Sequence, residues 1–198
     1  MCRAGKMRAT GAMNSARTGH TATLLNDGRA LVAGGFEGIN ALLSTAELFD
    51  PATGKFTLAS GPMNASRAHH AAALLSSGKV LLAGGSIDPL RGGIFDPMSV
   101  ARALLFDANA ASFSATGFMS SSRAHHTATL LSGGKVLVAG GANIVTAEGG
   151  CSPPHTQSTS LAGAELFDPT NAIFAVTSSM TTARSGHTAA CWQMETCL

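Results

Sequence analysis

The sequence is poor in charge and lacks any long apolar run. Charged side chains make up 12% of the 198 residues, and the formal net charge is +2 without a basic cluster. This balance argues against nucleic acid and anionic membranes as partners. No stretch approaches the roughly 20 apolar residues of a membrane helix, so no such helix is expected. The N-terminal MCRAGKMRATGAM lacks the apolar core of a signal peptide, which leaves the cellular compartment open.

Cysteine is also scarce, and no cysteine sits at a position that recurs along the chain. The scaffold is therefore not expected to depend on disulfides. Free thiols are favoured, and a Cys191–Cys197 disulfide or a metal site are the alternatives. The four residues are Cys2, Cys151, Cys191 and Cys197.

What the chain has in abundance is internal repetition. Three segments align without a gap: MNSARTGHTATLLNDGRALVAGG at 13–35, MNASRAHHAAALLSSGKVLLAGG at 63–85 and MSSSRAHHTATLLSGGKVLVAGG at 119–141. Met180 opens a fourth copy, MTTARSGHTAA. A unit repeated at this length is one supersecondary element that buries its apolar faces by stacking on its neighbours.

Each unit is predicted to hold four strands, called a to d. In the first unit these are His20–Leu25, Arg29–Ala33, Ser44–Phe49 and Lys55–Ala59. A glycine-containing turn joins strands a and b, which is a hairpin signal, and an Asp-Pro pair ends strand c. Small residues in strand a suit a crowded inner edge where the units converge.

Strand b carries the strongest packing signal. It is apolar at four consecutive positions in the second unit, Val80, Leu81, Leu82 and Ala83. A strand with one face exposed to solvent would instead alternate apolar and polar residues. Each sheet is therefore expected to lie between two others. The Gly-Gly pair after strand b predicts a close approach of another backbone, because a Cβ there would clash.

Four-stranded units of about 50 residues are typical of kelch-type β-propellers. The chain resembles bacterial kelch-repeat proteins at its Gly-Gly pairs and at an aromatic pair seven residues apart, over residues 4–190. The family usually has Tyr and Trp at the aromatic pair, and this chain has Phe at both positions. The resemblance implies an all-β fold like the central domain of galactose oxidase. The matching residues are Gly34-Gly35, Gly84-Gly85, Gly140-Gly141, Phe49/Phe56, Phe106/Phe113 and Phe167/Phe174.

The repeat predicts a partial propeller with three complete blades, at residues 13–62, 63–118 and 119–179. A strand d of a preceding blade is expected at 4–11 and the start of a fourth blade at 180–189. Residues 190–198 leave the pattern, and possible codons for them permit the expected pattern in a shifted reading frame, so the hypothesis is an out-of-frame tail. Three blades with flanking strands cannot close a ring, and exposed edges then favour self-association or poor solubility.

Every unit begins with arginine and histidine three residues apart. A functional hypothesis makes them a ring of cations and imidazoles that holds an anion or a metal. The structural hypothesis is that they satisfy backbone carbonyls where units meet, and repetition in every unit favours it. A zinc-binding histidine ring, extended by His69 and His125, is not favoured. The residues are Arg17, His20, Arg67, His70, Arg123, His126, Arg184 and His187.

Strand c and the b–c loops hold the remaining candidates. Glu47 and Glu165, with Leu104 at the equivalent position of the second unit, are interpreted as edge residues rather than general bases. The b–c loops, 36–45, 86–102 and 142–163, lengthen along the chain, and variable loops on a rigid scaffold often carry recognition. The longest can lie across the axial opening or form a disordered insert. Their binding candidates are Arg91, Glu148 and His155.

The sequence predicts a non-enzymatic interaction module that binds protein or carbohydrate through this loop face. Some kelch propellers are copper oxidases that need tyrosines, and this chain has no tyrosine, so that resemblance stops at the scaffold and no cofactor is expected. Nucleophile elbows, P-loops and dinucleotide fingerprints are also missing from the sequence. The alternatives are a piece of a larger kelch-containing oxidase or hydrolase and a gene remnant. Many relatives of this type are exported.

Overall fold

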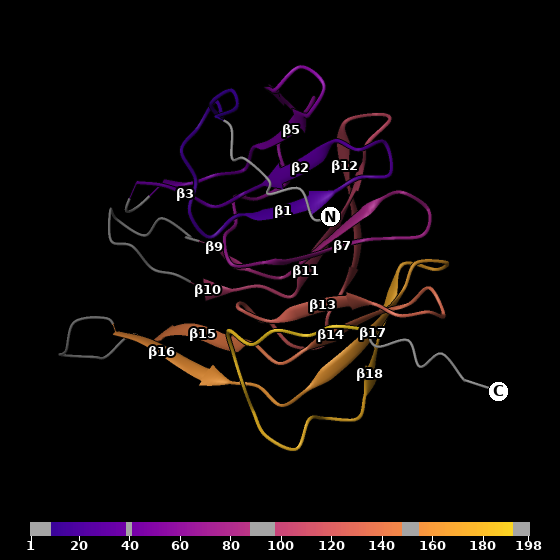
Figure 1. Cartoon of the computed structure of the whole chain (residues 1–198). Helices are drawn as coiled ribbons and strands as arrows, with labels where there is room; N and C mark the ends of the chain where they lie inside the picture. Colours follow the sequence, from indigo (N-terminus) through magenta and orange to yellow (C-terminus); the bar gives the residue numbers. More distant parts are fainter. Residues whose placement is uncertain (1–8, 39–40, 88–97, 148–154, 192–198) are drawn as a thin grey trace, which may run out of the picture.

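The computed structural model describes residues 9–38, 41–87, 98–147 and 155–191, and these contain β-strands but no helix. No helix able to cross a membrane is found within these ranges. Three four-stranded antiparallel sheets make up the body of the molecule and lie one on the next (Figure 1). The all-β fold with blade-like repeats is therefore confirmed, although the described residues form no closed ring.

Each sheet is a simple meander of strands a, b, c and d, as the sequence predicts. The first is β1-β2-β5-β6, with β1 (Thr21–Leu24), β2 (Ala30–Ala33), β5 (Ala46–Asp50) and β6 (Lys55–Leu58). The second contains β7 (Ala71–Leu74), β8 (Val80–Ala83), β11 (Arg102–Asp107) and β12 (Ser112–Phe118). The third contains β13 (Thr127–Leu130), β14 (Val136–Ala139), β17 (Ala164–Asp168) and β18 (Ile173–Thr177).

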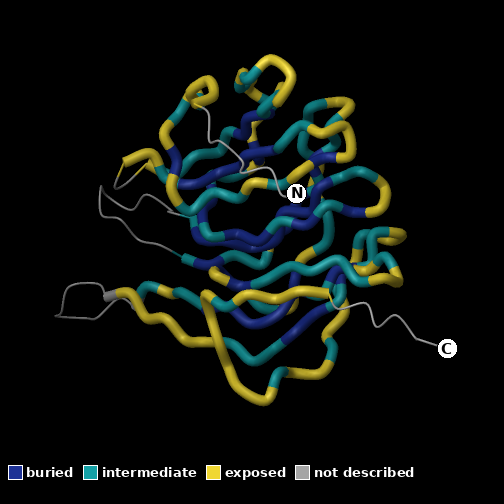
Figure 2. The backbone as a smooth tube through the Cα atoms, viewed as in Figure 1, coloured by how far each residue is buried: buried dark blue, intermediate teal, exposed yellow. Residues whose placement is uncertain are grey.

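The core lies between the sheets, and the central sheet is covered on both faces. Leu82 of β8 belongs to the cluster shared with the first sheet, whereas Leu81 of the same strand packs with the third. All four residues of β8 are fully buried (Figure 2). The continuous apolar run in strand b therefore has the cause expected from the sequence, because alternate side chains enter different interfaces.

The Gly-Gly pairs mark the contacts between successive units. A Cβ on Gly34 would lie 2.3 Å from the carbonyl oxygen of Arg67, and one on Gly84 would lie 2.4 Å from that of Arg123. Real Cβ atoms do not approach this closely, so any larger residue would push the units apart. The close backbone approach predicted from the sequence is confirmed at these positions.

The b–c connections form two-stranded antiparallel ribbons, here called the b–c ribbons. The third was expected to lie across the axial opening or to form a disordered insert. Its described residues form strands, which corrects the disordered insert, while a position across the opening stays a prediction. Its six residue pairs run from Ala142↔Ser160 to Ala147↔His155, and alternating β-branched residues such as Ile144 and Thr146 favour this extended form. The ribbons are β3 (Phe36–Glu37) with β4 (Ala41–Leu42), β9 (Ser86–Ile87) with β10 (Met98–Ser99), and β15 (Ala142–Ala147) with β16 (His155–Ser160).

The single strands predicted to flank the sheets, at 4–11 and 180–189, are only partly within the described residues, and those residues form no strand. Residues 9–11 form no strand, although the Gly11 N–H donates to the Gly54 carbonyl at 2.8 Å, and residues 4–8 lie outside the described part. Residues 180–189 also form no strand, because no described strand lies beside them to complete a ladder. Of the expected out-of-frame tail, 192–198 lie outside the described residues.

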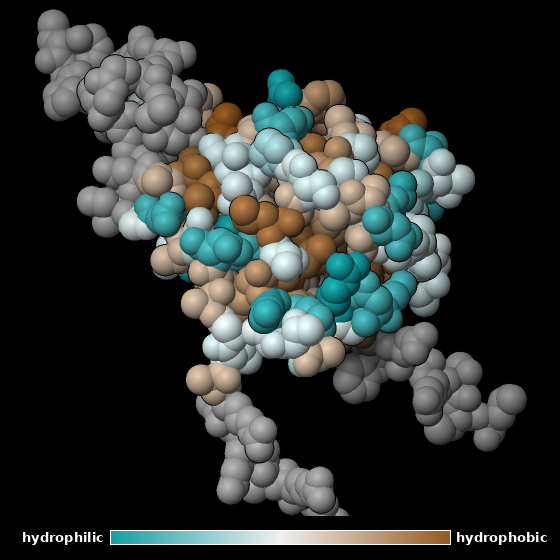
Figure 3. Space-filling model, turned by 90° about the horizontal axis from the view of Figure 1, so that it is seen from above, coloured by the Kyte–Doolittle hydropathy of each residue, from teal (hydrophilic) through white to brown (hydrophobic). Residues whose placement is uncertain are grey.

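Apolar residues gather on the face seen from above, over the first sheet (Figure 3). Leu24 of β1 and Leu58 of β6 are among the exposed large apolar side chains of this sheet. Phe49 is partly exposed here, whereas its equivalents Phe106 and Phe167 are buried against a neighbouring sheet. The aromatic face of each unit is thus the one that packs against the unit before it.

Candidate functional site

The segments that connect strand d of one unit to strand a of the next join the two units through their backbone. The N–H of Met63 donates to the Ser44 carbonyl at 2.7 Å, and the Arg67 N–H donates to the Leu43 carbonyl at 3.2 Å. In return the Gly35 N–H donates to the Arg67 carbonyl at 2.9 Å. The same three bonds recur at the next two junctions, so the main chain of Arg67 and its equivalents docks on the preceding unit.

The arginine side chain, by contrast, turns into its own unit. Arg17 Nη1 donates to the carbonyls of Gly34 and Thr45, both at 3.0 Å, and Nη2 lies 2.7 Å from Glu47 Oε1. The same carboxylate accepts the backbone N–H of Asn14 at 2.7 Å. Burial raises the pKa of Glu47, but hydrogen bonds from Asn14 and Arg17 outweigh burial and leave this pKa below its ordinary value. The pair is therefore ionised, and both side chains are fully buried.

The third unit repeats this arrangement. Arg123 Nη1 donates to the carbonyls of Gly140 and Gly163 at 2.9 Å, and Nη2 lies 2.8 Å from Glu165 Oε1. The Ser120 N–H donates to the second carboxylate oxygen at 2.7 Å. We call this set of contacts the arginine clamp.

Glu47 and Glu165 are not edge residues, which corrects the interpretation from sequence. They lie on β5 and β17, the third strand of each four-stranded sheet, and are at most 1% exposed. A buried carboxylate persists only with a partner of opposite charge and with its oxygens hydrogen-bonded. The arginine clamp meets both requirements.

The second unit has the arginine without the carboxylate. Arg67 is fully buried, and its Nη1 donates to the carbonyls of Gly84 and Arg102 at 3.0 and 3.2 Å. Its Nη2 has only a long bond of 3.4 Å to Asn64 Oδ1, and Nε has no partner among the described residues. Leu104 stands where the other units have glutamate. Burial and the charge of Arg102 lower the pKa of Arg67 to about 10.

The fourth copy keeps the backbone contact but not the clamp. The Gly141 N–H donates to the Arg184 carbonyl at 2.9 Å. The Arg184 side chain is exposed, and its Nε makes only a 3.4 Å bond to the Thr182 carbonyl. Backbone docking therefore does not require a buried guanidinium.

The histidines contact strand a of the preceding unit. His70 Nε2 lies 2.7 Å from Thr21 Oγ1, and His187 Nε2 lies 3.3 Å from Thr127 Oγ1. These bonds link consecutive units near the inner edge of the sheets. His20, at the equivalent position of the first unit, is partly buried, and its Nδ1 has no partner in the described structure.

His126 is the exception, because Ala71 replaces the threonine of the preceding unit. Neither ring nitrogen of the buried His126 makes a well-formed hydrogen bond within the described residues, although a contact with the Ala83 backbone acts to raise its pKa. Burial is the main reason that the pKa of His126 falls to about 3, with the charge of Arg123 adding to it. The pKa of His70 falls to about 3 for the same reasons, with Arg67 as the nearby charge. Both imidazoles are therefore neutral at neutral pH.

His69 and His125 form a stacked pair in an unusual backbone conformation. Both have φ of 55°, in the left-handed region that favours glycine, and the equivalent residues Gly19 and Gly186 have φ of 65° and 64°. The N–H of each copy donates to the carbonyl of the copy before it, at 2.8 to 2.9 Å. The two imidazole rings stack with centroids 4.1 Å apart. This backbone ladder crosses all four copies.

Of the other predicted site residues, His155 is the one that falls within the described part of the chain. Arg91 and Glu148 lie outside the described residues, as do Cys2, Cys151 and Cys197, whereas Cys191 has an exposed free thiol. His155 begins β16 and pairs with Ala147. Within the described ranges no three His, Cys, Asp or Glu side chains are grouped closely enough to hold a metal ion.

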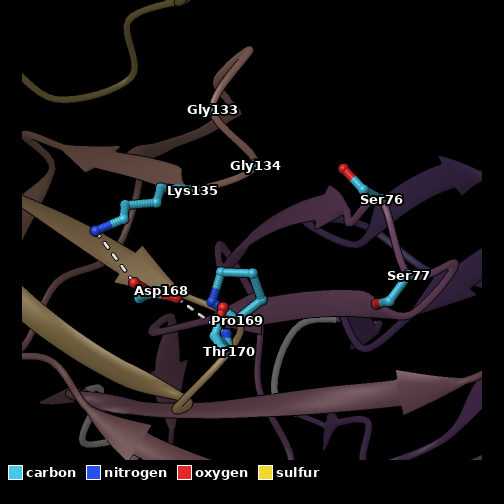
Figure 4. Close-up of a pocket in the computed structure, with 8 residues that line it drawn as sticks. All are labelled: Ser76, Ser77, Gly133, Gly134, Lys135, Asp168, Pro169 and Thr170. Atoms are coloured by element: carbon cyan, nitrogen blue, oxygen red, sulfur yellow. Dashed lines mark hydrogen bonds and ion pairs between the residues drawn. The ribbon is translucent and has the colours of Figure 1, made fainter.

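Two shallow hollows lie on the opposite face, where the a–b and c–d turns emerge. The larger, about 340 Å³, lies between the second and third units, with Ser76 and Ser77 on one side and Lys135 and Asp168 on the other (Figure 4). Lys135 Nζ is 3.1 Å from Asp168 Oδ2, so the charges compensate each other. A similar hollow of about 210 Å³ lies between the first two units. Sequence reasoning missed these hollows, because it expected binding on the ribbon face.

Comparison with known proteins finds no family model and no curated protein that matches the chain. A function can therefore be proposed only from the geometry of the chain itself.

Proposed function

We propose that this chain is an interaction module of the kelch-propeller kind, which binds a partner through the face that carries the b–c ribbons. The kelch assignment is supported by the Gly-Gly docking points and by the repeated aromatic pair, whose ring centroids are 4.8, 4.9 and 4.8 Å apart in the three units. Such a scaffold is rigid, and rigid scaffolds with variable connections usually serve recognition.

The observation that carries the proposal is the exposure of β16. Residues 156–160, with the sequence TQSTS, are all exposed, uncharged and in an extended conformation. Its one partner among the described strands is β15. An exposed strand without charges or proline can pair with an extended segment of another chain.

The third ribbon is held in place by its neighbour rather than projecting freely. Ser99 of β10 donates to Asn143 Oδ1 at 3.1 Å and accepts the N–H of Ile144 at 3.0 Å. Asn143 also accepts a bond from Ser122 Oγ at 3.1 Å. Because β15 is anchored in this way, β16 is presented in a defined position, which lowers the entropy lost on binding.

A protein partner that adds a strand to β16 is the function this geometry supports best. Carbohydrate is the second candidate, because Thr156, Ser158 and Ser160 share one face of β16 and present a row of hydroxyl groups, which suit hydrogen bonding to sugars. Self-association through exposed edges remains part of the same proposal, with a second copy as the partner.

Peptide and glycan arrays test the proposal, with two matched variants as probes. Ser158→Lys places a charge on β16, and Ser77→Lys places the same charge on an exposed serine of the turn face. We expect Ser158→Lys to weaken binding at least roughly tenfold, because an edge lysine opposes strand pairing. Ser77→Lys should bind like the unmodified chain. No enrichment on either array, or equal losses from the two variants, would overturn the proposal.

A further inference from the structure

The arginine clamp of the first unit defines a set of hydrogen-bond donors around a carboxylate. Glu47 accepts from Arg17 Nε at 3.1 Å, from the backbone and side-chain nitrogens of Asn14 at 2.7 and 2.8 Å, and from the Ser15 N–H at 3.3 Å. Donors of this number and charge are typical of anion sites. In this unit the chain itself supplies the anion.

The second unit keeps the donors and loses the anion. Arg67, Asn64 and Ala65 stand at the positions of Arg17, Asn14 and Ser15. Arg67 Nη2, the nitrogen that meets the carboxylate in the first and third units, has only the 3.4 Å bond to Asn64 Oδ1. Its Nε is buried without a partner, as Arg123 Nε also is, and the N–H groups of Asn64 and Ala65 donate to no acceptor within the described residues. An unpaired guanidinium in the interior is costly, so it favours any small anion that reaches it.

Leucine at position 104 supplies no carboxylate oxygen to Arg67. Its side chain ends at Cδ, one bond short of where the glutamate oxygens would lie. Leu104 is 1% exposed and belongs to the apolar cluster with the first sheet, so it points the same way as its equivalents. The exposed Asn64, held only by its 3.4 Å bond to Arg67, provides a route for exchange with solvent.

We propose that the second unit binds a small monovalent anion, chloride or a carboxylate as small as formate, beside Arg67 at the place that a glutamate carboxylate fills in the units on either side. The anion accepts from Arg67 Nη2, the donor that meets the carboxylate in both neighbouring units, and from the N–H groups of Asn64 and Ala65. The site neutralises the guanidinium and so stabilises the junction between the second unit and its neighbours.

Thermal unfolding at constant ionic strength tests this, with chloride or formate replacing a bulky sulfonate that does not fit the site. Saturating anion should raise the Tm by roughly 2–4 °C, because a ligand that binds only the folded state stabilises it. Leu104→Glu supplies the carboxylate from the chain. This variant should have a higher Tm in sulfonate and no response to chloride or formate.

A second measurement does not depend on the folding of any variant. The chloride NMR line should broaden in the presence of the unmodified protein, and formate should narrow it again by competition. The midpoints of the two titrations show which anion binds more tightly. Equal Tm values in all three anions, or a Leu104→Glu response equal to that of the unmodified chain, would overturn the site. Failure of formate to displace chloride would do so as well.

Discussion

The first and second units have the same strand order and the same Gly-Gly docking point, yet only the first pairs its buried arginine with a carboxylate. Arg17 meets Glu47 at 2.7 Å, whereas Arg67 faces Leu104 and keeps only carbonyl and amide oxygens. The backbone bonds by which the following unit docks on each of them also match. The comparison shows that apolar stacking and backbone docking define the repeat, while charge compensation varies from one unit to another.

The same contrast appears at the histidines. His70 reaches Thr21 of the first unit at 2.7 Å, but His126 has Ala71 at the equivalent position and no side-chain partner in the described structure, only a contact with the Ala83 backbone. The second unit thus departs from its neighbours at two polar positions, 71 and 104. It is also the sheet that is covered on both faces. Its extensive apolar burial can offset unsatisfied polar groups, which cost about 1–3 kcal/mol each.

Converting the first unit to the pattern of the second should have the largest effect. Glu47→Leu leaves Arg17 buried without a counterion, and we expect the free energy of unfolding to fall by about 3–5 kcal/mol. Denaturant titration measures the loss. The double variant Arg17→Met, Glu47→Leu should recover most of it, because the uncompensated charge is then gone. A loss below about 1 kcal/mol for the single variant would show that the clamp matters little.

Mild acid should weaken both junctions of the second unit. His70 and His126 have pKa values of about 3 in the folded chain, against roughly 6.5 when unfolded. The unfolded state therefore binds more protons as the pH falls below about 6.5, and stability decreases until the folded pKa is reached. One pH unit below 6.5 the two histidines together should cost about 3 kcal/mol.

Denaturant midpoints between pH 8 and 5.5 measure this acid effect. The carboxylates with lowered pKa values, such as Asp50 and Asp107, contribute only at lower pH. His69 and His125 have lowered pKa values because of burial and add to the loss. Stability that stays flat across this range would show that the buried imidazoles take up protons without unfolding.

The sheets were predictable from sequence because their pattern recurs, whereas the polar contacts between segments were only partly so. Strand b and the Gly-Gly pair at its end have nearly the same sequence in each unit, so the strand order and the close backbone approach could be predicted from the residues. The third ribbon could not be predicted in this way, because the b–c loops differ in length and sequence from unit to unit and share no recurring pattern. The arginine clamp had a visible signal, since Glu47 and Glu165 occur with Arg17 and Arg123, but its pairing required knowing that strand c lies beside the d–a segment.

The stacked histidines show another limit of sequence reasoning. Gly19 and Gly186 occupy the positions of His69 and His125, and an alternation between glycine and another residue signals a left-handed backbone. We recognised the histidines from their chemistry and missed this conformation. The signal lay in the comparison of the units, not in any one of them.

The smallest expected effect concerns the partner of His126. Ala71→Thr restores the hydroxyl that Thr21 supplies to His70, and Ala71→Val adds the same shape without the hydroxyl. Any strain from the added volume is common to both variants, so their difference isolates the hydrogen bond. We expect the threonine variant to be more stable than the valine variant by about 1 kcal/mol in denaturant titrations. If valine is equal or better, then His126 is satisfied by another route, and the two junctions of the second unit are more alike than their contacts indicate.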